Sequence, residues 1–307
     1  MDFGLTEDQR AIQDAVHRIL RPITSAPATA QRFIDGSTVE GRLKAAGFYE
    51  IVSSGGSELD AILAVEAVAM SPVCAEFGMT ALAAPLLCID VAPATAITTA
   101  TGDGPVRFLP RARTVICLGA AEGWLLDRDH MEITELSDTF GYPFGRLSST
   151  GYQGGRKLVA REVVRLRRAW LLVLATEILG AAQAALDLTV SHVKVRRQFG
   201  RAIGSFQAIQ HRLAEMATAI ESLRLLTYRA ALSQEGAEAA LALGFGQEVA
   251  ARVSYDSHQF HGALGQSLEY PLHYWTDRMR ALQGELGGYP AQYRAVGENW
   301  KSLESLY

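Results

Sequence analysis

The 307-residue sequence contains only three cysteines and has no excess of basic residues. Cys74, Cys88 and Cys117 are widely spaced and lack the paired spacing of metal ligands, so we expect reduced intracellular thiols. The formal net charge of -4 provides no basic footprint for a phosphate backbone. A nucleic-acid partner is therefore not expected.

The sequence also lacks the features of a secretory signal and of a clean membrane span. Acidic residues stand near the N-terminus, where a signal peptide would be basic, and no apolar core follows them. The apolar stretch 170–188 is interrupted by Glu177, Gln183 and Asp187 and falls short of a clean spanning length. We expect a buried helix there, no membrane span, and a cytoplasmic protein.

Several common catalytic motifs are missing. The sequence has no Walker or Rossmann Gly-rich loop and no nucleophile elbow. His258 and His261 share a helix face near Asp256, but a third well-placed ligand is lacking, so we expect no metal site. The basic run 156–168 is interrupted by Glu162, and we interpret it as a solvated helix start rather than a phosphate contact.

The pattern along the chain predicts a mainly α protein with a small β domain. Residues 1–95 are rich in alanine and leucine with helical periodicity, which indicates an N-terminal helical domain. Residues 96–155 contain short apolar runs separated by turn residues, which indicates a middle β domain. Residues 156–307 predict a C-terminal four-helix bundle. Its long helices are expected at residues 162–197, 205–235, 238–262 and 271–283.

The most informative segment is residues 196–211, which read Arg-Arg-Gln-Phe-Gly-Arg-Ala-Ile-Gly-Ser-Phe-Gln-Ala-Ile-Gln-His. The planar guanidinium of Arg196 suits a pyrophosphate, because its forked donors match phosphate oxygens and its charge is permanent. Phe199 offers an aromatic face to an adenine. The segment is therefore a candidate binding site for a dinucleotide.

Small residues shape the same segment. Gly200 and Gly204 bracket a tight connection, and Ser205 is expected to open the next helix as its N-cap. The free N–H groups of such a helix start favour nearby anions. The alternative interpretation is a helix–turn–helix corner with solvated arginines.

Two further segments accompany this one in a set order. Residues 1–14 contain Thr6 and Gln9 at the spacing of a helix capping box. Residues 259–265 read Gln-Phe-His-Gly-Ala-Leu-Gly, and residues 269–273 read Glu-Tyr-Pro-Leu-His. Together with residues 196–211, these segments resemble the acyl-CoA dehydrogenase family, and the resemblance runs over nearly the whole chain.

The resemblance implies the family's fold, a helical domain, a middle β domain and a C-terminal four-helix bundle, and it implies FAD as cofactor. Carried over residue by residue, Arg196 would bind the flavin pyrophosphate, Gln198 a phosphate or ribose oxygen, and Phe199 the adenine. From the second segment, Gln259 and Gly262 would approach the pyrophosphate, where a missing side chain lets backbone come close. The remaining residues expected to line the site are Ile203, Phe206, Gln207 and Ile209.

The chain departs from the family pattern in its middle domain. Full-length members carry a Thr-Glu-Pro-type segment with a following Gly-Ser, which contacts the flavin ring and the acyl-CoA. No such segment occurs between Glu76 and Thr150, and the stretch is short for a full barrel. The middle β domain is therefore expected to be reduced.

The second departure concerns the catalytic base. The family reaction needs a carboxylate to remove the α-proton of the thioester while a hydride leaves the β-carbon for the flavin. At one family location this chain has Gln198, an amide, and at the other Glu285 falls one residue early. Glu285 is either a base whose pKa is raised by burial or a solvated glutamate in a Gly-rich loop, and we expect the second. Residues 289–293 do not resemble the helix that normally follows the base.

A chain that keeps the adenine and pyrophosphate segment but lacks the base resembles the β-type subunit of bacterial heteromeric acyl-CoA dehydrogenases. The resemblance implies an α-type partner subunit in an α2β2 heterotetramer, an acyl-CoA substrate with a bulky acyl group such as a steroid side chain, and an electron-transfer flavoprotein as acceptor. The alternatives are a self-sufficient dehydrogenase that uses Glu285 as base and a structural subunit without flavin.

Overall fold

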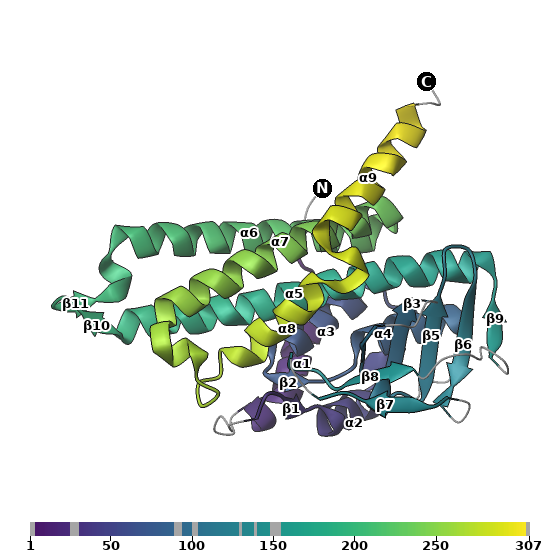
Figure 1. Cartoon of the computed structure of the whole chain (residues 1–307), viewed down its shortest axis with the longest axis horizontal. Helices are drawn as coiled ribbons and strands as arrows, with labels where there is room; N and C mark the ends of the chain where they lie inside the picture. The colour runs from purple at the N-terminus through teal and green to yellow at the C-terminus, as the bar shows by residue number, and fades with distance from the viewer. Residues whose placement is uncertain are drawn as a thin grey trace.

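Figure 1 shows short N-terminal helices, two small sheets and a set of long helices that crosses the whole molecule. One helix, α5 (Ala160–Val195), runs between the other elements and packs against α3, α4, α6, α7 and α8. The computed structural model describes residues 4–24, 31–88, 94–99, 104–128, 131–137, 140–147 and 155–304.

The N-terminal region begins with a helix whose first turn is capped as predicted. The backbone N–H of Gln9 donates to the hydroxyl of Thr6 at 3.2 Å, and the backbone N–H of Thr6 donates to the Gln9 amide oxygen at 3.0 Å. This confirms the predicted capping box. The elements here are α1 (Glu7–Thr24), β1 (Ile34–Asp35), α2 (Ser37–Ala45), α3 (Glu58–Met70), β2 (Val73–Cys74) and α4 (Gly78–Leu87).

The middle region forms two sheets, with strand orders β3-β5-β6-β9 and β4-β8-β7. In the central strand β5, Val115 and Cys117 face a small core between the sheets, while Ile116 and Leu118 face the helices. This alternation follows the period of two in a β-strand. The strands are β3 (Thr95–Thr99), β4 (Val106–Arg107), β5 (Thr114–Leu118), β6 (Gly123–Asp127), β7 (Ile133–Glu135), β8 (Phe144–Leu147) and β9 (Arg156–Leu158).

The C-terminal region consists of long helices around α5. By length and composition α5 could cross a membrane, but 89% of its most apolar window is buried inside the molecule. The buried helix predicted for residues 170–188 is thereby confirmed. The helices that accompany it are α6 (Gln207–Ser233), α7 (Gly236–His261), α8 (His273–Gln283) and α9 (Gly288–Glu304).

Two local expectations for this region were wrong. The first residues of the basic run, Arg156 and Lys157, belong to strand β9, so α5 starts only at Ala160. Ser205 is not the N-cap of α6, because it lies in a 3-10 turn and its hydroxyl donates to the carbonyl of Ala202. Helix α9 was not among the predicted helices, and it tolerates Pro290 in its first turn, where a missing N–H costs nothing.

The crossing of α3 and α5 depends on a glycine. A Cβ atom added at Gly180 would lie 2.5 Å from the carbonyl oxygen of Glu66 and 2.7 Å from the Cβ of Ala69. The backbones of the two helices therefore approach as closely as they do only because this position has no side chain.

We predict that Gly180→Ala lowers the free energy of unfolding by about 1–3 kcal/mol, because the added methyl group forces the helices apart. Gly236→Ala is the matched control, since a Cβ there meets no atom within 4 Å. Chemical denaturation of both variants measures the difference. Equal stability of the two would contradict the proposed close packing.

Candidate functional site

The segment singled out in the sequence forms an exposed hairpin at one end of the long helices (Figure 1). Strands β10 (Arg197–Gln198) and β11 (Arg201–Ala202) pair antiparallel. The turn between them holds Phe199 at φ 50° and Gly200 at φ 79°. Positive φ at both central residues is the geometry of a type I′ turn, which glycine adopts readily and phenylalanine only at a steric cost.

The strained residue presents its ring to solvent. Phe199 is 89% exposed, and its ring contacts that of Phe206 edge-on with centroids 6.1 Å apart. The guanidinium of Arg201 lies 4.0 Å from the centroid of the Phe206 ring. The exposed ring of Phe199 therefore stands beside the half-buried ring of Phe206 and the guanidinium of Arg201, and we call these three side chains the platform.

The other residues predicted in this segment surround the platform. Arg196 caps the C-terminus of α5, and its carbonyl accepts a hydrogen bond from the N–H of Ile203 at 2.8 Å. Gly204 lets the chain lie against α5, because a Cβ there would meet the carbonyl oxygen of Val193 at 3.0 Å. Ile203, Phe206 and Ile209 are half-buried, whereas Arg196, Gln198 and Gln207 are exposed.

The second predicted segment forms the wall of a hollow of about 560 Å³ at the end of α7. Gln259 lies exposed on the last turn of α7, and Gly262 follows at φ 60° with open space where a side chain would be. We call this the α7–α8 hollow. It is lined by Ala251, Ser254, Tyr255, His258, Gln259, Gly262, Ala263, Gln266, Arg280 and Gln283.

A stacked pair of histidines joins the hairpin to this hollow. His192, which precedes Arg196 by one helical turn, stacks on His261 with ring centroids 4.3 Å apart. The Nδ1–H of His261 donates to the carbonyl of Ser257 at 2.8 Å, so its Nε2 accepts from the hydroxyl of Tyr270 at 3.2 Å. The structure thus brings the two predicted segments to one end of the helices.

Both histidines are held in the neutral form. Burial lowers the pKa of His261 to about 4, and repulsion from His192 and His258 adds to the effect. Burial also lowers the pKa of His192, as does the nearby charge of Arg196. Two protonated rings stacked face to face would repel each other, so the stack depends on neutrality.

This stack makes stability depend on pH. Folding depresses the pKa of His261 from 6.5 to about 4. The contribution of neutral His261 to the free energy of unfolding is therefore complete above about pH 6.5 and is lost as the pH falls toward 4. We predict that the melting temperature drops over this window and that His261→Gln reduces the drop. His211→Gln, an exposed change on α6, is the control. Parallel pH profiles for wild type and His261→Gln would contradict the assignment.

Several residues of the α7–α8 hollow were missed from the sequence. The hydroxyl of Ser254 is buried, lines the hollow and has no hydrogen-bond partner within the described chain. Arg280 reaches the hollow from α8. The spacing of Ser254, Tyr255 and His258 relative to Gln259 and Gly262 marks one face of α7 and could have indicated them, but no local pattern indicates Arg280.

Glu285, the candidate base, lies elsewhere and is not solvated. Its carboxylate accepts a hydrogen bond from Nε of Arg107 at 2.7 Å, and its side chain is 20% exposed. Its backbone carbonyl accepts from the amide of Gln247 at 3.0 Å. The expectation of a solvated glutamate was therefore wrong, because a residue of the distant strand β4 binds it.

Arg107 is the centre of a buried cluster between the sheets and the helices. Its side chain is 7% exposed, and its NH1 group donates to Glu177 of α5 at 2.7 Å. The ring of Tyr142 lies 4.7 Å from the guanidinium. Burial opposes the charge of Arg107, but Glu177 and then Glu285 outweigh it and hold the pKa above its ordinary value. Both carboxylates are thus bound to a permanent cation.

The remaining candidates have structural partners. Nε2 of His258 lies 3.1 Å from the hydroxyl of Thr276, and across the described residues no group of three histidine, cysteine, aspartate or glutamate side chains is placed to hold a metal ion. In the basic run, Lys157 pairs with Glu122 at 2.8 Å, and Arg168 pairs with Glu58 at 2.7 Å. These positions therefore serve hydrogen bonding and ion pairing within the chain.

Comparison with known proteins identifies the fold. Residues 153–297 match the family model "Acyl-CoA dehydrogenase, C-terminal domain". The acyl-CoA dehydrogenase IpdE2 of Mycolicibacterium smegmatis is 36% identical over 125 residues, which cover 41% of this chain and 40% of that protein. The acyl-CoA dehydrogenase FadE34 of Mycobacterium tuberculosis is 33% identical over 211 residues, covering 64% and 29%. The matched part thus spans less than half of each relative.

Solved structures agree over nearly the full chain. The ChsE4-ChsE5 complex from Mycobacterium tuberculosis matches with a TM-score of 0.78 at 21% identity, covering 98% of this chain and 99% of that one. The Tcur3481-Tcur3483 steroid ACAD, solved as a variant, matches with a TM-score of 0.82 at 22% identity, covering 97% and 99%. Butyryl-CoA dehydrogenase from Megasphaera elsdenii has a TM-score of 0.78 at 20% identity, covering 98% and 100%.

Residues 153–297 therefore match the C-terminal domain of acyl-CoA dehydrogenases, and the chain as a whole has the acyl-CoA dehydrogenase fold. The predicted fold class, mainly α with a small β domain and a C-terminal helical bundle, is confirmed.

Proposed function

We propose that this chain is one subunit of a heteromeric FAD-dependent acyl-CoA dehydrogenase. It contributes the adenine and pyrophosphate part of the FAD site, and an α-type partner subunit supplies the catalytic base. The observation that carries this proposal is the pairing of Glu285, the candidate base, with the buried Arg107. Its carboxylate accepts a hydrogen bond from the Arg107 guanidinium at 2.7 Å and is therefore engaged within this chain.

The exposed end of the long helices fits the FAD dinucleotide. Phe199 is a large apolar ring left 89% exposed by the chain itself, which suits stacking with adenine. Arg196 supplies a guanidinium for the pyrophosphate, and Gly262 lets a phosphate approach the backbone. Ser254 lines the same hollow, and its buried hydroxyl has no hydrogen-bond partner among the described residues. The other expected contacts come from Gln198, Ile203, Phe206, Gln207, Ile209 and Gln259.

FAD, when bound, would accept the hydride that leaves the β-carbon of the acyl group. The residues of this chain bind and orient one end of that cofactor. They do not take the α-proton, because Glu285 is bound to Arg107 and Gln198 is an amide without basic character. The proton acceptor therefore belongs to the partner subunit.

The partner and the substrate class are supported by the solved structures with the same fold. Among these are the ChsE4-ChsE5 complex and the Tcur3481-Tcur3483 steroid ACAD. We infer an α2β2 heterotetramer that acts on an acyl-CoA with a bulky acyl group, such as a steroid side chain. An electron-transfer flavoprotein is the inferred acceptor, and the assembly is inferred to be cytoplasmic.

We predict that Arg196→Ala reduces the FAD retained by the assembled complex about tenfold or more, because a charge-assisted contact with the pyrophosphate is lost. Arg18→Ala, an exposed change on α1, leaves retention unchanged. Flavin absorbance per complex after gel filtration measures both. Full flavin content and activity in an Arg196→Ala/Phe199→Ala complex would instead indicate a structural subunit without flavin contact.

We further predict that Glu285→Gln leaves the turnover of the complex within about twofold of wild type, while lowering the free energy of unfolding by about 1–2 kcal/mol through the weakened contact with Arg107. Steady-state kinetics and denaturation measure the two effects separately. A large loss of turnover with flavin retained would show that Glu285 is the base of a self-sufficient enzyme.

A further inference from the structure

The backbone of His192 fixes where Arg196 leaves helix α5. The carbonyl of His192 accepts the N–H of Arg196 at 2.9 Å, which closes the last turn of the helix. The carbonyl of Arg196 in turn accepts from the N–H of Ile203 at 2.8 Å. Both backbone groups of Arg196 are thus bonded, so the position of α5 at His192 determines the position from which the Arg196 side chain projects.

The ring of His192 contacts two other aromatic rings. It stacks on His261 with centroids 4.3 Å apart and an interplanar angle of 25°, and it meets Tyr270 edge-on at 6.2 Å. The rings of His261 and Tyr270 lie 5.0 Å apart. We call these three side chains the ring cluster. It joins the end of α5 to the end of α7 and to the loop before α8.

His261 is the fixed member of the ring cluster. It is 5% exposed, and its two ring nitrogens are bonded to the carbonyl of Ser257 and the hydroxyl of Tyr270. The turn that follows folds back against it, since a Cβ added at Gly265 would lie 2.9 Å from the Cβ of His261. His261 therefore offers a fixed surface at the start of the turn that contains Gly262.

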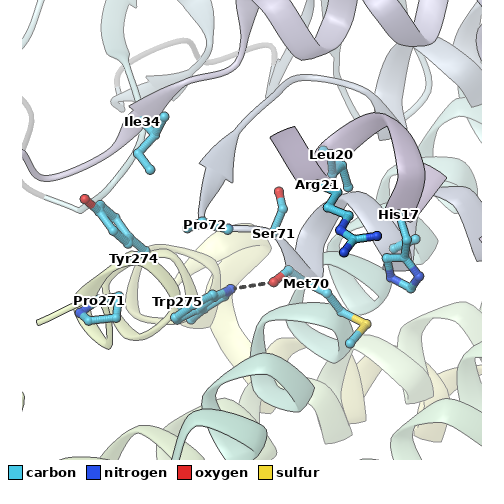
Figure 2. Close-up of a pocket in the computed structure, with 11 residues that line it drawn as sticks. His17, Leu20, Arg21, Ile34, Met70, Ser71, Pro72, Pro271, Tyr274 and Trp275 are labelled. Carbon is cyan, nitrogen blue, oxygen red and sulfur yellow. Dashed lines mark hydrogen bonds between the residues drawn. The ribbon is translucent and has the colours of Figure 1, made fainter. Parts of the chain in front are cut away.

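The ring cluster is also attached to the N-terminal helices. Pro271, the residue after Tyr270, lies beside Trp275 of α8 in Figure 2. The indole N–H of Trp275 donates to the carbonyl of Met70, at the end of α3, at 3.0 Å (Figure 2). The loop that carries Tyr270 is thus held by α3 through α8.

We propose that His192 is a positioning residue for the FAD dinucleotide. By stacking on His261, its ring sets the distance between the backbone of Arg196 and the turn at Gly262, whose groups the proposed function places at the pyrophosphate. This inference rests on that proposed function and adds to it a residue that acts through Arg196. Binding groups that are already in place lose less free energy when the ligand arrives.

The stack needs a flat ring at position 192 but no charge. Burial lowers the pKa of both His192 and His261, so both rings are neutral and stack as uncharged aromatic rings do. Phenylalanine at position 192 keeps a flat ring, whereas leucine is apolar and favours a helix but cannot stack. The variants His192→Phe and His192→Leu therefore differ in the one contact that the proposal invokes.

The test dilutes the assembled, FAD-loaded complex and follows the fluorescence of released flavin, which gives the dissociation constant of FAD. We expect His192→Leu to raise this constant about tenfold and His192→Phe to stay within about threefold of wild type. Ser191→Ala, an exposed change on the same turn of α5, is the control and leaves the constant unchanged. The native mass of each variant shows that the complex is assembled.

A double variant separates positioning from a general loss of stability. If His192 acts through Arg196, adding His192→Leu to Arg196→Ala raises the dissociation constant by less than about twofold, because the contact that the ring positions is already lost. A structural defect alone would instead multiply the two single effects.

Three outcomes would overturn the proposal: an unchanged dissociation constant in His192→Leu, equal weakening by His192→Leu and His192→Phe, or full multiplication of the effects in the double variant. The proposed function fails in a different way, because Arg196→Ala would then retain FAD as wild type does. Weakening by Arg196→Ala but not by His192→Leu would leave the shared flavin site in place and remove only the positioning role.

Discussion

A buried arginine determines how the middle sheets of this chain meet its long C-terminal helices. Arg107 leaves the end of strand β4 and contacts Glu177 on α5 and Glu285 in the loop after α8. A charge taken out of water must be paired, and leaving one partner missing is strongly destabilising. The contacts that fix the middle sheets against the long helices therefore also bind Glu285, the candidate base. In this arrangement Glu285 is a structural partner of Arg107.

At the hairpin end, by contrast, side chains are left exposed or without a partner among the described residues. There the chain breaks local rules, with Phe199 at positive φ and its ring exposed, and it leaves the hydroxyl of Ser254 without a partner in the described residues. Such departures cluster at functional sites, where a ligand or a partner compensates for them. An exposed hairpin, together with a Glu285 carboxylate that is bound to Arg107, supports the proposed role of a subunit that contributes part of a flavin site. The neutral histidine stack keeps the two halves of that open end together.

The sequence predicts the features that neighbouring residues determine, and it does not predict contacts between distant segments. The capping box at Thr6 and Gln9 and the buried helix at residues 170–188 follow from short-range patterns, and both are present. The tight connection expected at Gly200 is also present, as the turn between β10 and β11. The ion pair of Arg107 with Glu285 joins positions far apart in the sequence, and no periodicity or motif connects them. Strand β9 was also missed, because its pairing with β6 rather than its composition makes it a strand.

The central claim is that this chain shares a flavin site rather than forming one. The most direct measurement is the visible spectrum and native mass of the chain purified alone and after co-expression with a longer acyl-CoA dehydrogenase subunit. A shared flavin site gives a colourless chain alone and a yellow heterotetramer with the partner. A yellow homotetramer formed by this chain by itself, with dehydrogenase activity, would contradict it.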